Sequence, residues 1–255
     1  MFSKANPETA CGMWSKTYII ALIIVLSLIV IGLYFSRKMS HKAVYKTIII
    51  ATVLAIMIEI GKMLFIGITY GLEEVDFLPL YFCSLFMYGG ILASIKKVKV
   101  LQTMGLSFLT MGGIFGATSF FMYPSTCIPR YPIYHYMCLR TMLYHGGMIY
   151  IGLLILITKY YVPNLKDFKK YFVALIIVGI LAYIINTVKG SDLMYISKPL
   201  SFIPLTVKIY KWNSKVYSLI ALIVEIVAPY FLSYGIYILI SKIRNKKEKN
   251  EYVYN

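Results

Sequence analysis

The sequence has few charged residues, and acidic ones are especially scarce. Asp, Glu, Lys and Arg together make up 14% of the 255 residues, whereas 60% are hydrophobic. Charged residues approach about a quarter of an ordinary soluble domain. The balance therefore excludes a soluble domain and is typical of a chain that lies in a bilayer. Because apolar segments take up nearly the whole length, no room is left for a separate soluble catalytic domain.

The chain also lacks the short motifs of several enzyme and binding classes. It contains no Walker loop and no GxGxxG or GxSxG element, and its 4 cysteines and 3 histidines show no CxxC, HxxxH or HExxH spacing. We therefore expect neither a metal site nor a cofactor. The formal net charge of +16 does not indicate a nucleic-acid partner, because the basic residues lie in loops and form no recognisable nucleic-acid-binding motif.

Long apolar runs are what the sequence does contain. At about 1.5 Å per residue, such runs are long enough to cross a hydrocarbon core of roughly 30 Å as helices. They predict an all-α polytopic transmembrane bundle of about seven spans, near residues 18–35, 47–71, 77–95, 100–123, 141–158, 171–188 and 216–241. The first run ends in Ser36-Arg37-Lys38 without a small-residue cleavage site, so we interpret it as a span and not as a signal peptide.

The distribution of Lys and Arg between the loops predicts the orientation. One set of alternate loops holds about twice as many of these residues as the other set, and the richer set faces the cytoplasm in most membrane proteins. We expect an outer N-terminal segment at residues 1–16, a single bundle domain at 17–241 and a basic cytoplasmic tail at 242–255. The last outer loop departs from the pattern with Lys189, Lys198, Lys208, Lys211 and Lys215. The expected location is the cell membrane, in contact with lipids.

Two further features concern packing. Residues 199–212 are apolar and aromatic but too short to cross, and Pro204 interrupts them, which predicts an interfacial or re-entrant piece. Small residues allow transmembrane helices to approach closely. Gly112 and Gly116 form a GxxxG pair that predicts such packing, and two further helices contain paired glycines, Gly89 with Gly90 and Gly146 with Gly147. The same glycine-rich faces leave association with a second copy or another membrane protein open.

Ionisable and nucleophilic side chains within the spans are the candidate functional residues, because such groups are costly in a bilayer unless they are paired or face a cavity. Glu225 has no partner nearby in the sequence. Counting residues from the span ends at the rise of a helix puts the whole set in the same half of the bundle. The sequence thus predicts one shared polar site, made from Glu59, Lys62, Cys83, Arg140, His145, Asn186 and Glu225.

Each of these residues also has a purely structural interpretation. Glu59 and Lys62 are three residues apart on one helix face, where they could simply neutralise each other. Arg140 lies beside a span end, from which a long side chain can reach the interface. His145 could be a hydrogen-bonded packing residue, and Cys83 a small apolar one. Both interpretations stay open at this stage.

Cys127 and Cys138 lie in or near the same predicted outer loop, with His135 between them. The two cysteines could form a disulfide, but sequence spacing establishes neither their distance nor their oxidation state.

Several of these residues belong to a recognisable pattern that extends from Glu59 to Pro199. The pattern resembles the bacterial YwaF-like integral membrane family, although Tyr81 stands where that family usually has histidine. This family is distantly similar to the eukaryotic transmembrane protein 164 group, a resemblance that implies lipid acyl transfer with a cysteine and a histidine. The matching residues are Glu59, Lys62, Leu78-Pro79-Leu80, Cys83, His145-Gly146, Asn186, Gly190-Ser191-Asp192, Met194-Tyr195 and Lys198-Pro199.

The resemblance suggests a chemical hypothesis in which His145 deprotonates Cys83 and the thiolate attacks a lipid ester. Lys62, Asn186 or Lys189 would then bind the lipid phosphate or polarise the carbonyl. A transporter or binding protein for a small polar or ionic solute is the alternative, with the solute passing Glu59, Lys62, Arg140, Asn186 and Glu225. A structural partner of another membrane protein is a third possibility.

Overall fold

The computed structural model describes residues 2–71, 77–200 and 203–253, with side chains described as far as residue 243. The described residues form helices and no strand. The helices are α1 (Lys16–Ser36), α2 (His41–Tyr70), α3 (Leu85–Ser94), α4 (Lys99–Ser107), α5 (Gly113–Met122), α6 (Tyr136–Ile157), α7 (Phe168–Lys189), α8 (Pro204–Trp212) and α9 (Ser214–Val253), with a π-helical turn at Phe108–Gly112 and short 3-10 turns at Pro7–Thr9, Leu165–Asp167 and Leu193–Tyr195.

Six of the helical segments are long and apolar enough to cross a membrane. Five coincide with predicted spans, namely α1, α2, α6, α7 and the segment from α4 to α5, which matches the predicted span at 100–123. The sixth, α9, covers the last predicted span and continues beyond it to Val253. Serine side chains set the start of two of them, because Ser15 accepts a hydrogen bond from the Tyr18 N–H and Ser40 accepts one from the Ala43 N–H. The prediction of a multi-pass helical bundle is therefore confirmed.

The predicted span at 77–95 differs from a continuous helix. Its helical part, α3, has 10 residues, which at about 1.5 Å each cover only half of a bilayer core. Residues 77–84 form bends and turns instead, although most of their side chains are apolar, as in the spanning helices. Non-helical backbone at membrane depth requires protein partners for its polar groups. Ser84 has them, since its hydroxyl donates to Glu59 and its carbonyl accepts from Tyr144.

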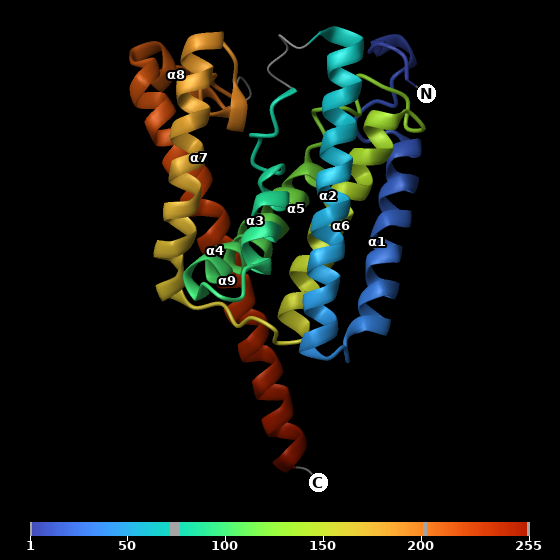
Figure 1. Ribbon diagram of the computed structural model, residues 1–255, viewed down its shortest axis with the longest axis vertical. Helices are drawn as coiled ribbons and strands as arrows, with labels where there is room; N and C mark the ends of the chain where they lie inside the picture. Colours follow the sequence, from blue (N-terminus) through green and yellow to red (C-terminus); the bar gives the residue numbers. More distant parts are fainter. Residues whose placement is uncertain (1, 72–76, 201–202, 254–255) are drawn as a thin grey trace.

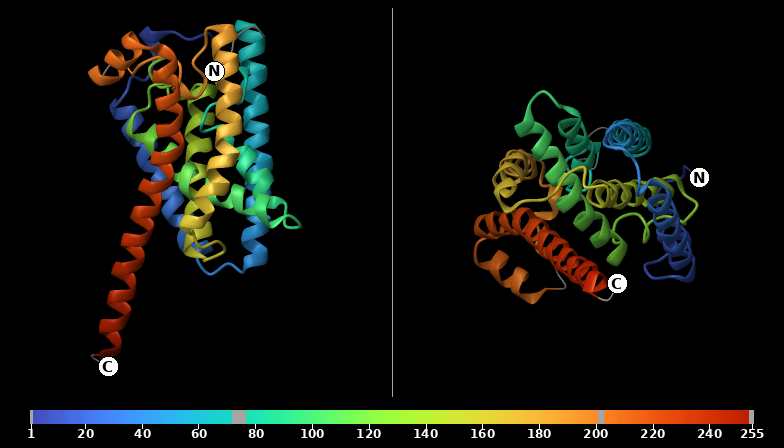
Figure 2. Two further views of the ribbon diagram at one scale, coloured as in Figure 1. Left: turned by 90° about the vertical axis from the view of Figure 1, so that its left-hand side faces the viewer. Right: turned by 90° about the horizontal axis from the view of Figure 1, so that it is seen from below.

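The segment from α4 to α5 forms the centre of the bundle. Of its most apolar window, 72% is buried, a larger share than in any other candidate span of the described chain. Figures 1 and 2 show this segment crossing between α1, α2 and α6 on one side and α7 and α9 on the other. The π-helical turn at Phe108–Gly112 separates α4 from α5, and Ser233 of α9 donates a hydrogen bond to the Met111 carbonyl in this turn. Such turns are frequent at functional sites.

Two features distinguish the ends of the bundle. The short helix α8 contains no buried residue and lies at the end of the bundle where α7 finishes and α9 begins (Figures 1 and 2). This placement supports the interfacial interpretation of residues 204–212. At the same end, the N-terminal segment packs on residues 127–135, because Asn6, Cys11 and Gly12 donate backbone hydrogen bonds to Arg130, Tyr131 and Ile128.

Candidate functional site

The candidate site begins with a buried charge cluster between α2 and α6. The Lys62 Nζ lies 2.8 Å from the Glu59 Oε2, and the Arg140 Nη2 lies 3.9 Å from the Glu59 Oε1. The side chains of Glu59, Lys62 and Arg140 keep only 2%, 7% and 10% of their surface exposed. Arg140 thus points to Glu59, with 10% of its side chain exposed, and whether it also lies near the membrane interface stays a prediction.

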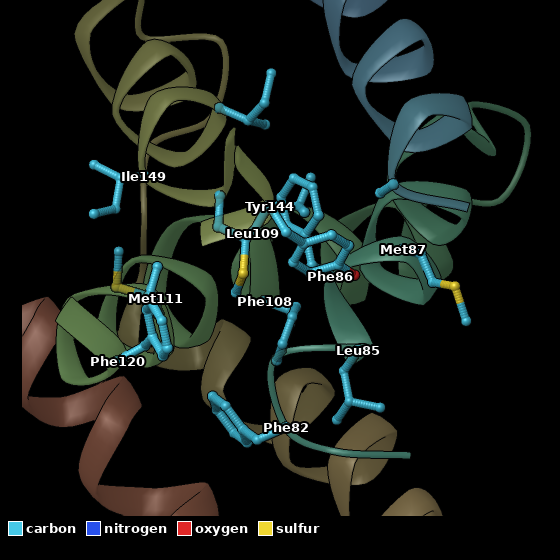
Figure 3. Close-up of a cluster of buried hydrophobic side chains, with 14 of the residues drawn as sticks. Phe82, Leu85, Phe86, Met87, Phe108, Leu109, Met111, Phe120, Tyr144 and Ile149 are labelled. Atoms are coloured by element: carbon cyan, nitrogen blue, oxygen red, sulfur yellow. The ribbon is translucent and has the colours of Figure 1, made fainter. Parts of the chain in front are cut away.

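The broken segment before α3 closes this cluster. The Ser84 hydroxyl donates a hydrogen bond of 2.6 Å to the Glu59 Oε1, and the Tyr144 hydroxyl lies 3.4 Å from the Ser84 carbonyl oxygen. Tyr144 itself packs edge-on against Phe86, with ring centroids 5.8 Å apart, within the aromatic core of Figure 3. Ser84 therefore ties residues 77–84 to α2 and α6 by polar contacts, and these contacts position Cys83, the residue before it.

Cys83 and His145 both approach the same helix, α5. A Cβ atom added at Gly116 would lie 3.6 Å from the Cys83 Sγ, and the His145 ring stacks on Phe120 with centroids 4.0 Å apart. Gly116 and Phe120 are four residues apart, or about 6 Å along the helix. Cys83 and His145 share no hydrogen bond in the part of the chain that the structure describes, and they contact α5 at positions one helical turn apart.

The hydrogen bond of His145 determines which of its nitrogens carries the proton. The Nδ1 atom lies 2.8 Å from the Thr141 carbonyl oxygen, which can only accept. In the neutral ring, Nδ1 is therefore protonated and Nε2 keeps its lone pair. This tautomer is the one that a general base requires, because Nε2 remains available to take a proton.

Glu225, the last member of the predicted site, lies on α9. Its carboxylate is near enough to interact electrostatically with Cys83 and with Tyr171. The Tyr171 hydroxyl is buried and has no hydrogen-bond partner among the described residues. It lies against the π-helical turn, where a Cβ atom added at Gly112 would come within 2.9 Å of it. Glu225 thus brings a further polar group into electrostatic range of Cys83.

Asn186 and Lys189 occupy a different position. The Asn186 amide forms four hydrogen bonds with residues 191–197: it donates to the Leu193 carbonyl and to Ser197, and accepts from Ser191 and the Leu193 N–H. These bonds fold the chain after α7, where Gly190 takes a left-handed conformation with φ of 66°. Lys189 is exposed. The geometry gives Asn186 a structural task, and substrate binding by either residue stays a prediction.

The four cysteines are free thiols. The Cys138 Sγ lies 3.6 Å from the Cys127 carbonyl oxygen, so the two side chains are neighbours without a disulfide in this structure. Within the described residues, no group of three His, Cys, Asp or Glu side chains is arranged to hold a metal ion.

Comparison with known proteins adds one finding to this geometry. The family model described as the TMEM164 family matches residues 13–228. The chain belongs to the TMEM164 family. No curated protein and no solved structure gives a significant match. The narrower bacterial YwaF-like assignment stays a prediction.

The match to the TMEM164 family includes the whole candidate site. Residues 13–228 contain the Glu59 cluster, Cys83, His145 and Glu225, and they exclude most of the N-terminal segment and the second half of α9. The site therefore belongs to the part of this TMEM164-family protein that the family model describes. Two features of the site could not be recognised in the sequence, namely Ser84 and Tyr144, because neither is ionised or part of a motif. The sequence offers one signal for them, which is that each stands next to a predicted site residue, Ser84 after Cys83 and Tyr144 before His145.

His135 connects the N-terminal segment of this TMEM164-family protein to α6. It is fully buried, and its Nε2 lies 3.1 Å from the Ser3 carbonyl oxygen, while its Nδ1 accepts the Met137 N–H at 3.1 Å and so caps α6. The proton therefore lies on Nε2, which donates to Ser3, and Nδ1 can accept the Met137 N–H only while the ring is neutral. Burial lowers the pKa of His135 below its usual 6.5.

We expect acidification to weaken the N-terminal cap of α6, because a protonated Nδ1 can no longer accept the Met137 N–H. Because the folded pKa of His135 is depressed, its contribution is complete above about pH 6.5 and is lost as the pH falls through the folded pKa. Loss of the cap should cost about 1 kcal/mol. Hydrogen exchange of the Met137 amide, corrected for the intrinsic rate, should therefore be faster at pH 5 than at pH 7.5. His135→Asn can cap α6 without titrating in this range, and an equal pH response in that variant would contradict the prediction.

Proposed function

We propose that this member of the TMEM164 family transfers or hydrolyses acyl chains of membrane lipids, with Cys83 as nucleophile and His145 as general base. The observation that carries the proposal is the arrangement of these two side chains on one face of α5, with the His145 Nδ1 bonded to Thr141 and its Nε2 available. A second support is the resemblance that implies cysteine and histidine chemistry on lipids. The site lies within a bilayer, where ester groups are near the headgroup boundary.

In the proposed reaction, the His145 Nε2 takes the thiol proton as the Cys83 Sγ attacks the carbonyl carbon of a lipid ester. The carbon–oxygen bond of the ester then breaks, the leaving alkoxide receives the proton from the imidazolium, and a thioester remains on Cys83. A second alcohol, or water, reverses these steps and takes the acyl chain. Proton transfer during the attack matters here, because a free thiolate in the interior of the bundle would be an unfavourable buried charge.

The Glu59 cluster favours this function over solute transport. Both Glu59 oxygens are engaged, one by Ser84 and the other by Lys62. A carboxylate held in this way supports the backbone beside Cys83. In a carrier, by contrast, the carboxylate would have to release these partners to bind a passing solute. We therefore assign Glu59 and Lys62 a supporting role, next to the reacting groups.

We also propose that the bundle crosses the membrane seven times, with residues 77–95 as a broken third crossing. In Figure 1 the chain runs from the upper end of α2, through α3, to the start of α4 in the lower part of the bundle. This path puts the two chain ends on opposite sides of the bundle. The Lys and Arg distribution supports an outside N-terminus and a cytoplasmic C-terminus in the cell membrane.

Replacement of either reacting residue should abolish the activity. We expect cells with Cys83→Ala or His145→Gln to show the membrane acyl profile of a strain that lacks the protein, because each change removes the nucleophile or the base. The measurement is lipid mass spectrometry of a deletion strain complemented with each variant at matched protein level. Cys11→Ala is the matched control, since Cys11 is a partly exposed thiol in the N-terminal segment, near residues 127–135. Native profiles in both site variants would refute the proposed roles.

A further inference from the structure

Arg140 is the cation of the cluster that the protein leaves unsatisfied. Its guanidinium makes no hydrogen bond to any described residue, and its Nε is completely buried without a partner. The nearest acidic atom, the Glu59 Oε1, is 3.9 Å from the Nη2, which is beyond hydrogen-bond distance. The Tyr144 ring faces the guanidinium, with 5.9 Å between the Cζ and the ring centroid.

Glu59 does not turn to meet Arg140 because its oxygens have closer partners. The Ser84 hydroxyl is 2.6 Å from the Oε1, and the Lys62 Nζ is 2.8 Å from the Oε2. A rotation of the carboxylate to satisfy Arg140 would break one of these contacts. Leaving the buried Nε–H without an acceptor is unfavourable. The arrangement is therefore suited to an acceptor that comes from outside the protein.

An oxyanion is the acceptor that best fits these donors. The Nε and Nη2 of a guanidinium point in parallel and bind two oxygens of a phosphate or carboxylate together. Arg140 lies four residues after the start of α6, or about 6 Å along the helix. This depth is close to the boundary where the phosphates of lipid headgroups are found.

We propose that Arg140 is a binding site for a phosphate oxyanion, supplied by the headgroup of a phospholipid or by free phosphate. This inference deepens the proposed function and rests on it for the assumption that a lipid enters the site. With the phosphate on Arg140, the ester groups of the same lipid would extend toward Cys83, whose thiol is close enough to interact electrostatically with Arg140. Arg140 acts as a positioning residue and takes no part in bond breaking.

Binding should be measured with the full chain in detergent, in a Cys83→Ala background that cannot turn over a lipid. The probes are dioctanoyl phosphatidylglycerol, dioctanoylglycerol, which has the same acyl chains without phosphate, and inorganic phosphate. Arg140→Gln is the test variant. Arg130→Gln is the matched control, because Arg130 is an exposed arginine of the chain segment just before α6.

We expect phosphatidylglycerol to raise the unfolding temperature of the parent and dioctanoylglycerol to raise it far less. Arg140→Gln should weaken phosphatidylglycerol binding at least tenfold, and Arg130→Gln less than twofold. If inorganic phosphate alone gives the same Arg140-dependent shift, the oxyanion site is supported and its source is the free ion. Equal binding by Arg140→Gln and the parent, or equal effects of the two lipids, would overturn the proposal.

Two additional measurements separate a binding role from a structural one. Without ligand, Arg140→Gln should be at least as stable as the parent, since it removes a buried charge that lacks a hydrogen bond. A lower stability together with unchanged phosphatidylglycerol affinity would make Arg140 structural and overturn the proposal. Arg140→Lys keeps the charge and loses the paired donors, so an affinity between those of Gln and Arg is expected. Acyl transfer without Arg140-dependent binding would refute this inference alone, whereas binding without Cys83-dependent chemistry would refute the proposed function alone.

Discussion

Glu59→Gln should lower the free energy of unfolding by about 3–5 kcal/mol, the usual cost of removing one partner of a buried ion pair. The substitution keeps an acceptor for Ser84 but removes the charge that lies 2.8 Å from Lys62 and 3.9 Å from Arg140. Two cations would then share an interior position without this anion. Reversible unfolding in mixed micelles is the measurement.

A double-mutant cycle isolates the part of this loss that belongs to the ion pair. If the 2.8 Å contact is responsible, Glu59→Gln with Lys62→Gln should cost less than the two single changes added together. Glu8→Gln is the matched control, because Glu8 is exposed in the N-terminal segment and its change should stay within about 0.5 kcal/mol. A Glu59→Gln protein as stable as the parent would show that the carboxylate charge does not support the site.

The depth of a residue in the bundle is the part of the site that the sequence predicts well. Depth follows from counting residues along a helix of constant rise. This count predicts that Glu59 and Arg140 lie at the same level on different helices, and the 3.9 Å between their side chains agrees with it. Whether residues at one level also face each other depends on how the helices are rotated and packed. Asn186 illustrates the difference, because it bonds to residues 191–197 and not to the cluster around Glu59.

The break before α3 shows a second limit. Hydropathy measures whether a segment can leave water, and residues 77–84 are apolar enough whether they are helical or not. What distinguishes them is the supply of tertiary hydrogen bonds, such as those from Ser84 to Glu59 and from Tyr144 to Ser84. These bonds join residues 25 and 60 positions apart, so no local pattern records them. The π-helical turn escapes prediction in the same way.

The glycines show how the same limit affects packing, and they lead to the second large prediction. The GxxxG pair does lie at close contacts, since Gly112 faces Phe108 and Tyr171 and Gly116 faces Phe82. The most restrictive helix crossing is elsewhere, at Gly105 on α4. A Cβ atom there would overlap the Ala93 backbone nitrogen and the Gly89 carbonyl oxygen and would lie 2.9 Å from the Ala93 Cα.

Gly105→Ala should therefore destabilise the protein by about 3 kcal/mol or more, the upper part of the range for overpacked cores. The obstacle is the backbone of α3, which cannot rotate away as a side chain would. Movement of α3 would also displace Ser84 and Cys83, which precede it directly. We expect the loss to appear both in mixed-micelle unfolding and as faster labelling of Cys83 by a thiol reagent.

Gly147→Ala on α6 is the matched control for this effect. A Cβ atom at Gly147 would meet nothing within 4 Å, and alanine is the better helix former by about 0.5–1 kcal/mol. The two identical substitutions should therefore change stability in opposite directions. If Gly105→Ala were tolerated as well as Gly147→Ala, α3 and α4 would have to separate at little cost, and the close packing that positions Cys83 would not be needed for the fold.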